Sequence, residues 1–261
     1  MQKKVVRSVF LMIFLGLIKY GPFSEFGYIF LGGLIYDSII IEFWKNPQNA
    51  ALYFKSKLPK YRNEYIRLSI SYLFRIKVDN KYLLIRGERI TGQFQPVGGV
   101  YKMLPEAKST LGELGVRDDN NIRDKISKDD LRIRVKGKYL MKFLNWYDSG
   151  KERENSNFRE FCEELIEPGI LSKEVFPYIN TRHIKRHQTD IRYSNYFRCP
   201  EILIAEIYEL IPNEEQEQKL RELMNKDSDK YIWVNEETIL KRGVTDQNFE
   251  ANISETSEWI I

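Results

Sequence analysis

Two long apolar stretches at the start of the chain constrain its folding more than any other feature. "VFLMIFLGLI" covers Val9–Ile18, and "FGYIFLGGLIYDSIIIEFW" covers Phe26–Trp44. A bilayer core takes about 20 mostly apolar residues per helix. The second stretch meets that length, and the first does so when residues 5–20 are counted. We therefore predict a two-helix transmembrane hairpin within residues 1–45, with helices at about 5–20 and 26–44.

The placement of charges gives this hairpin an orientation. Lys3 and Lys45 flank its outer ends, whereas Lys19 lies in the short connection. Because positive residues stay on the cytoplasmic side, both termini are predicted in the cytoplasm. Asp37 and Glu42 are costly in lipid and are expected to face a helix partner or a water-filled path. Two alternatives are a cleaved signal peptide, for which no small-x-small cleavage site follows, and two buried helices of a soluble core.

Composition excludes several classes of function. The formal net charge is only +4, which is too balanced to indicate nucleic-acid binding by itself. The two cysteines, Cys162 and Cys199, are far apart and form no zinc-binding pair. The only histidines are His183 and His187, so a histidine-rich metal site is excluded. Any metal would depend on carboxylates, which suits Mg²⁺ or Mn²⁺.

The rest of the chain alternates strand-like and helix-like segments, which indicates an α+β domain. After a basic juxtamembrane connector at 46–66, residues 65–87 have the pattern of a β-hairpin that turns at Asp79–Asn80. "QPVGGVYK" follows, and its Gly98–Gly99 pair would let the backbone approach a neighbour closely. A long insertion is predicted next, at about 103–157.

The later elements are predicted from periodicity and from turn residues. Strands are expected in "DLRIRVKG", "PEILIAEIYELIP" and "KYIWVN", and helices in "KYLMKFLNWYDSG", closed by Gly150, in "NEEQEQKLRELMNK" and in "EETILKRG". A further helix in "NFREFCEELIEPGIL" should end at Pro168–Gly169. The tail at 243–261 is polar and expected to be loosely ordered, although Trp259–Ile261 could dock back. Nothing repeats at a fixed period, so solenoids are excluded.

The segment "REFCEEL" is the strongest candidate for chemistry. On a helix, Glu160, Glu163 and Glu164 stand at i, i+3 and i+4 and project from one face. Such a face can bind a divalent cation. In the alternative, Asn157 is the helix N-cap, Glu160 completes a capping box, and the other acids favour the positive end of the helix. Arg159 is placed to hold a carboxylate.

This segment and "QPVGGVYK" together resemble the two halves of a Nudix box. "REFCEE" matches the Arg-Glu half with its paired glutamates, and Gly98–Gly99 match the turn that opens the box. The box is split, because Glu106 follows Gly99 one residue too far and the insertion comes next. With the membrane hairpin, this arrangement resembles the SMODS-associated Nudix proteins. Those are effectors in cyclic-oligonucleotide-based anti-phage signalling systems of bacteria.

The resemblance implies a Nudix fold, an α/β/α sandwich with a mixed sheet, over residues 67–242. It also implies that bound Mg²⁺ or Mn²⁺ ions clamp phosphates and activate a water, with the carbonyl near Gly98 completing the metal shell. Nudix enzymes hydrolyse nucleoside diphosphates linked to another group, and Glu160 or a neighbour would be the general base. The implied catalytic residues are Glu160 and Arg159, which orients it. The implied metal ligands are Glu160, Glu163 and Glu164.

A basic and aromatic segment, "NTRHIKRHQTDIRYSNYF", is the second candidate site. In one hypothesis it contacts the phosphates and stacks on the bases of a nucleotide. In the other it is a solvated, basic β-hairpin surface. The predicted nucleotide-binding residues are Gly98, Gly99, Arg182, Lys185 and Arg186.

The leading hypothesis is a membrane-anchored effector that senses a cyclic oligonucleotide in the cytosol and disrupts the inner membrane, causing abortive infection. Its expected partners are that messenger, the lipid bilayer, further copies of itself on activation, and a cognate cyclic-nucleotide synthase. Two other hypotheses are a membrane-tethered, Mg²⁺-dependent Nudix hydrolase and a catalytically inactive binding scaffold. The intact glutamate triad favours metal binding over a pure scaffold, and the split box counts against fast hydrolysis.

Overall fold

The computed structural model describes residues 47–87, 92–119, 129–244 and 251–261. The chain divides into two compact units, Met1–Phe54 and Lys55–Ile261, and the boundary falls inside helix α4 (Pro47–Lys57). Both predicted transmembrane helices lie outside the described residues, so the hairpin stays a prediction. Within the described ranges, no helix is long and apolar enough to cross a membrane.

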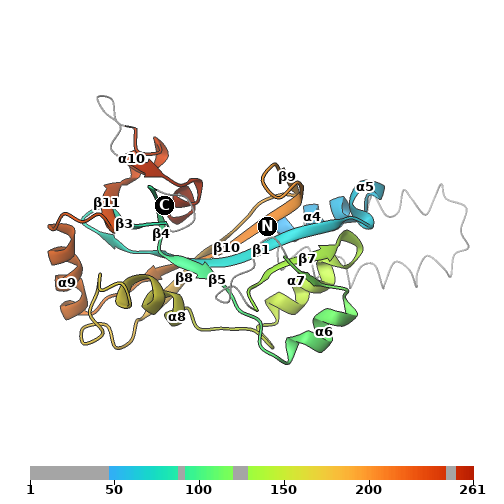
Figure 1. Ribbon diagram of the computed structural model, residues 1–261, viewed down its shortest axis with the longest axis horizontal. Helices are drawn as coiled ribbons and strands as arrows, with labels where there is room; N and C mark the ends of the chain where they lie inside the picture. The colour runs from blue at the N-terminus through green and yellow to red at the C-terminus, as the bar shows by residue number, and fades with distance from the viewer. Residues whose placement is uncertain (1–46, 88–91, 120–128, 245–250) are drawn as a thin grey trace, which may run out of the picture. The chain divides into compact units, whose positions relative to one another are not determined.

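The larger sheet of the second unit is built on two long strands, β1 (Tyr65–Arg75) and β10 (Cys199–Leu210). They run parallel and side by side, from Arg67 opposite Glu201 to Arg75 opposite Glu209 (Figure 1). Antiparallel strands flank this pair. These are β5 (Gly98–Val100) and β7 (Arg132–Lys136) on β1, β8 (Thr181–Gln188) and β9 (Arg192–Ser194) on β10, and β6 (Arg117–Asp118) on β7. The combination confirms the predicted α+β class with a mixed sheet.

The smaller sheet has the strand order β11-β3-β4-β12, with β2 on β3. Its strands are β2 (Lys77–Val78), β3 (Lys81–Arg86), β4 (Gln93–Pro96), β11 (Tyr231–Asn235) and β12 (Asn252–Ile253). The predicted hairpin turn is confirmed, because Asp79 and Asn80 have φ of 46° and 64° between β2 and β3. One feature of that prediction is wrong. The chain passes from the larger sheet to the smaller one at the buried Ile76, so β1 and β3 do not pair.

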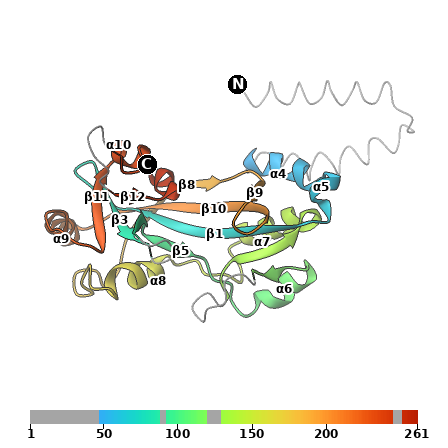
Figure 2. The same cartoon turned by 45° about the horizontal axis from the view of Figure 1, so that its top comes forward.

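Short helices surround the two sheets (Figure 2). Helix α7 (Leu140–Asp148) turns its apolar side inward and buries Leu140, Phe143 and Leu144. It ends before Gly150, whose φ is +68°, as predicted. The remaining helical elements are α5 (Pro59–Arg62), α6 (Ala107–Glu113), η2 (Gly137–Tyr139), α7 (Leu140–Asp148), α8 (Phe158–Phe161), η3 (Cys162–Ile166), α9 (Glu214–Met224), α10 (Glu236–Leu240) and η4 (Glu255–Ile260).

The predicted insertion leaves and re-enters the domain at one narrow neck, which we define as residues 102–104 and 152–154. The Leu104 amide donates to the Glu152 carbonyl, and the Glu154 amide donates to the Lys102 carbonyl, both at 2.8 Å. Between these points, β7 pairs with the first half of β1, next to β5 on the second half. The insertion therefore extends the larger sheet along β1, the strand that also pairs with Gly98 and Gly99 of β5.

The end of the chain packs into the core beside the smaller sheet. Ile253, Trp259 and Ile260 are buried among Leu84, Phe94 and other apolar side chains of this core. The docking of Trp259–Ile261 is confirmed, and the expected loose order is wrong for Ala251–Ile261. Four apolar side chains in the last eleven residues outweigh the polar composition of the tail, because burial of each removes apolar surface from water.

Candidate functional site

The helix that carries "REFCEE" begins without the predicted capping box. Asn157 is at the N-cap position, but its side-chain amide donates to the Thr181 hydroxyl at 3.1 Å, and it makes no capping bond. The Phe158 amide instead donates to the Ser156 hydroxyl oxygen at 3.2 Å. Glu160 is engaged elsewhere, which removes the second half of the box. The capping alternative for Glu160 is therefore wrong.

The helix also changes its winding within the motif. α8 is α-helical, whereas η3 is a π-helical turn in which the Glu167 amide donates to the Cys162 carbonyl at 2.9 Å. Each residue of a π-turn rotates the chain less than a residue of an α-helix does. Glu160, Glu163 and Glu164 therefore do not stand on the regular i, i+3, i+4 face that the sequence predicted. Such turns are frequent at functional sites. The predicted stop is confirmed, since Gly169 has φ of +73° directly after the turn.

Arg159 lies at the centre of the site. Its Nε and Nη2 bind the two carboxylate oxygens of Glu154 at 2.9 and 3.0 Å. Its Nη1 donates to Glu160 Oε1 at 2.7 Å and to Glu163 Oε2 at 3.0 Å, and Nη2 also donates to the Val100 carbonyl at 3.1 Å. A guanidinium has five N–H groups, and these contacts use all of them. We call Arg159, Glu154, Glu160 and Glu163 the Arg159 cluster.

The Gly-Gly turn makes room for this cluster. A Cβ on Gly99 would lie 2.0 Å from the carboxyl carbon of Glu160, so only glycine allows the carboxylate to pack there. A Cβ on Gly98 would lie 2.2 Å from the Tyr72 carbonyl, and Gly98 has φ of +145°. The predicted close backbone approach is thus confirmed. The group that approaches Gly99 is the Glu160 carboxylate. It occupies the space next to Gly99 in which the sequence analysis expected a nucleotide.

Burial and charge act against each other in the Arg159 cluster. Burial raises the pKa of Glu160 above its ordinary value of 4.5, and the attraction of Arg159 offsets only part of that rise. Burial alone lowers the pKa of Arg159, but its contacts with Glu154 and Glu160 outweigh burial and raise the pKa. The cluster therefore holds a permanent cation beside a carboxyl group that resists ionisation.

This arrangement does not fit the predicted divalent ion. A metal needs carboxylate oxygens that converge on it, whereas Glu160 Oε1 and Glu163 Oε2 both accept from Nη1 of Arg159. Glu164 lies on the π-turn. Among the residues that the structure describes, no three His, Cys, Asp or Glu side chains form a group suited to a metal.

The predicted basic segment forms strand β8 with β9, and its cations are paired. Arg182 binds Glu209, and the Lys185 ammonium donates to the Ile261 carbonyl at 2.7 Å. Arg186 reaches the opposite side of the strand. The three residues are therefore not gathered into one phosphate site.

Arg186 belongs to a polar network around the buried Glu206 that sequence reasoning missed. Its Nε donates to Glu206 at 2.8 Å and its Nη2 to Asp148 at 2.7 Å. His183 and Tyr147 also bind Glu206, at 2.7 and 3.3 Å. The available signal was Glu206 inside the otherwise apolar run "ILIAEIY", because a charge in a central strand needs buried partners.

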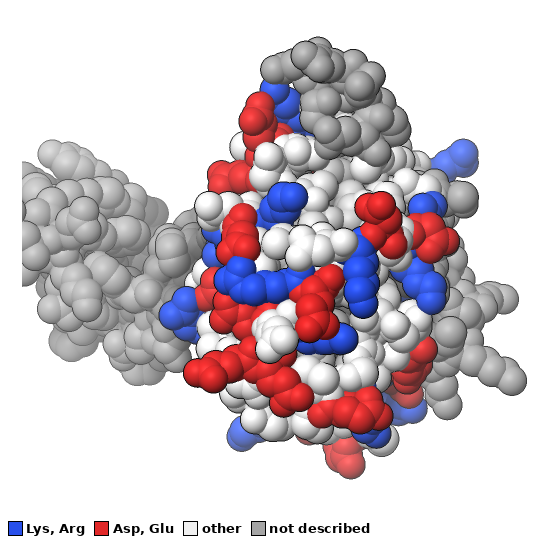
Figure 3. Space-filling view, turned by 90° about the vertical axis from the view of Figure 1, so that its left-hand side faces the viewer, with Lys and Arg blue, Asp and Glu red and all other residues white. Residues whose placement is uncertain are grey.

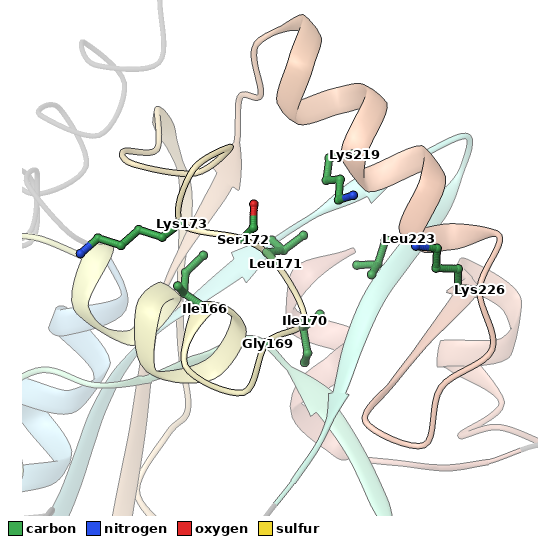
Figure 4. A pocket seen from close by; sticks show the side chains of 9 residues that line it. All are labelled: Ile166, Gly169, Ile170, Leu171, Ser172, Lys173, Lys219, Leu223 and Lys226. Carbon is green, nitrogen blue, oxygen red and sulfur yellow. The ribbon is translucent and has the colours of Figure 1, made fainter.

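A hollow of about 480 Å³ lies between the residues after the π-turn and helix α9 (Figure 4). Its apolar lining includes Ile170, Leu171 and Leu223. Lys219 on α9 and Lys226 just after this helix lie at its rim, whereas the Lys173 side chain points away (Figure 4). On the face of the molecule where α9 lies, basic and acidic side chains are interspersed (Figure 3).

The family model of the SMODS-associated NUDIX domain matches the chain over residues 65–261. No curated protein matches the chain. The match begins at the first residue of β1 and includes the insertion, the "REFCEE" segment and the docked end of the chain. It agrees with the resemblance carried by the split box.

Proposed function

Because the chain belongs to the SMODS-associated NUDIX domain family, we propose that it is an effector of a cyclic-oligonucleotide-based anti-phage system. Its folded domain binds the nucleotide messenger in the cytosol. Its N-terminal apolar stretches then act on the inner membrane. The family match supports the link to a pathway that contains a cyclic-oligonucleotide synthase.

The Arg159 cluster favours recognition of a nucleotide over hydrolysis. A Nudix hydrolase would need its glutamates available to Mg²⁺, which clamps phosphates and activates water. Here the guanidinium already donates hydrogen bonds to one oxygen of Glu160 and to one oxygen of Glu163. This single observation supports a binding domain and counts against the tethered hydrolase.

We propose the hollow beside α9 as the place where the nucleotide binds. Its volume of about 480 Å³ falls in the range of small-molecule sites. Its apolar floor suits a base, and the Lys226 ammonium suits a phosphate, whereas the Lys219 ammonium is paired with Glu222 at 3.1 Å and would have to exchange that partner for a phosphate. Lys219→Gln plus Lys226→Gln should weaken binding of cyclic dinucleotides, whereas Lys151→Gln, at an exposed lysine elsewhere, should not. Equal binding by both variants would remove the hollow from the proposal.

The membrane part of the proposal depends on the apolar stretches of the sequence. One two-helix hairpin is too small to enclose a pore, and Asp37 and Glu42 are costly against lipid. Association of several chains would let these acids face a shared interior, and Gly32–Gly33 would permit close helix contact. The messenger can drive this association only if the assembled state binds it more tightly than single chains do.

Membrane leakage in cells tests the whole proposal. Cells would produce the chain together with a cyclic-nucleotide synthase, and entry of a membrane-impermeant dye would be followed. We expect leakage that needs both the synthase and residues 1–45. Asp37→Leu should reduce it, and Lys19→Gln serves as a control in the same segment. Equal toxicity of the chain lacking residues 1–45 would show that the membrane is not the target.

A further inference from the structure

We infer that the Arg159 guanidinium occupies the position of a divalent metal ion among the carboxylates of the Arg159 cluster. Through Glu154 it also holds the neck of the insertion against the larger sheet. The inference goes beyond the proposed function and does not depend on it, because it rests on contacts within the domain. It predicts that the wild-type cluster takes up no metal, and that removal of the guanidinium creates a metal site.

The first step is the number of contacts. All five N–H groups of Arg159 donate to oxygen, four of them to carboxylates and one to a carbonyl. Three carboxylates thus surround one positive centre. A divalent ion would have to displace a cation that is held bidentately by Glu154, the strongest geometry for an arginine.

The second step is what the contacts connect. Glu154 belongs to the neck, where its amide donates to the Lys102 carbonyl at 2.8 Å. Val100 belongs to β5 of the larger sheet, and Glu163 belongs to the π-turn. Arg159 therefore joins the neck, the sheet and the helix through one planar group. A metal held only by the helix glutamates would not make the first of these connections.

The third step is the charge that remains without the guanidinium. Glu154, Glu160 and Glu163 would then face one another with no cation between them. Carboxylate oxygens are the ligands that hard cations such as Mn²⁺ prefer. The same three side chains that exclude the metal in the wild type should capture it in an Arg159→Ala variant.

Titration with Mn²⁺ tests the metal half of the inference. The full chain in detergent micelles would be titrated while free Mn²⁺ is followed by electron paramagnetic resonance. We expect no saturable site in the wild type, and at least about tenfold tighter binding in Arg159→Ala. Adding Glu163→Gln to that variant should abolish the gain. Saturable binding in the wild type that Arg159→Ala leaves unchanged would overturn the inference.

Arg159→Lys is the matched control, because it keeps the charge but not the fork of donors. It should bind no Mn²⁺, and its retained charge protects the fold if Arg159→Ala unfolds. A folded Arg159→Ala chain that binds no Mn²⁺ would also refute the inference, since the guanidinium would then not occupy a cation position.

Hydrogen exchange tests the neck half. In Arg159→Lys, the amides of Leu104 and Glu154 should lose protection, because the bidentate contact to Glu154 is lost. The Ser254 amide, which donates to the Phe94 carbonyl at 2.8 Å in the smaller sheet, serves as the internal control. Unchanged exchange at both neck amides would overturn the fastening role.

Discussion

Two arginine clusters attach the insertion to the larger sheet, and they differ in charge balance. In the Arg67 cluster, Arg67 binds Asp119 and Glu201 at 2.6 Å each, and Arg134 binds Asp119 at 3.0 Å. These four residues comprise two cations and two carboxylates. The Arg159 cluster has one cation and three carboxylates.

The two clusters also differ in exposure. The Arg67 side chain is 4% exposed and lies 3.7 Å from the centre of the Phe197 ring, whereas the Arg159 side chain is 25% exposed. Buried charges must be matched, because an unpaired ion is costly away from water. An excess of carboxylates is tolerated only where solvent reaches it, as at Glu163, whose side chain is 38% exposed.

The largest expected effect is loss of the buried cation. Arg67→Leu leaves Asp119 and Glu201 without their shared partner and should lower the free energy of unfolding by about 3–5 kcal/mol. Denaturant unfolding of the full chain in detergent measures this. Adding Asp119→Asn and Glu201→Gln should restore part of the loss. A change below about 1 kcal/mol, the level of a surface pair, would contradict the contrast in burial.

A smaller loss of unfolding free energy is expected for the Arg159 cluster, which is more exposed than the Arg67 cluster. Arg159→Gln removes charged hydrogen bonds, but Glu163 can turn to water, so the expected cost is about 1.5–3 kcal/mol. Mn²⁺ at millimolar concentration should restore part of it in this variant and none of it in Arg67→Leu. Thermal unfolding with and without the ion makes the comparison. Equal rescue of both variants would mean that the clusters do not differ in their affinity for cations.

The third and weaker effect is a pH dependence of protein stability that comes from Glu160 in the Arg159 cluster. Because burial raises the folded-state pKa of Glu160, the folded protein binds this proton more tightly than the unfolded chain. The stability contributed by the proton is complete below the ordinary pKa of 4.5 and is lost as pH rises through the folded-state value. Wild type should therefore lose stability relative to Glu160→Gln as the pH rises above about 4.5. Parallel curves from unfolding at several pH values would contradict this.

The smallest effect is expected for the exposed pair on β8. Arg182 is 71% exposed in its contact with Glu209, and exposed pairs contribute about 0–1 kcal/mol. Arg182→Gln should therefore change denaturant unfolding little. A loss as large as that of Arg159→Gln would show that exposure does not separate the clusters.

The sequence predicted turns and helix ends better than it predicted contacts between side chains. The turn at Asp79–Asn80, the helix closed by Gly150 and the close approach at Gly98–Gly99 followed from local preferences, and each is confirmed. Glu154 was missed, because its contact with Arg159 depends on how the insertion closes its neck. The π-turn was also missed, since periodicity assumes regular α-helical winding. Pairing of Arg186 with Glu206 required the register of β8 on β10, which no local pattern encodes.

The central claim is that this domain recognises a nucleotide without a metal and without hydrolysis. The most direct test is binding of a panel of cyclic di- and trinucleotides to the full chain in detergent, measured by calorimetry in Mg²⁺ and in EDTA. The ligand would then be recovered and separated by chromatography. The account predicts at least one ligand that binds with the same affinity in both buffers and is recovered intact. Binding that requires Mg²⁺, or recovery of cleaved products, would contradict it.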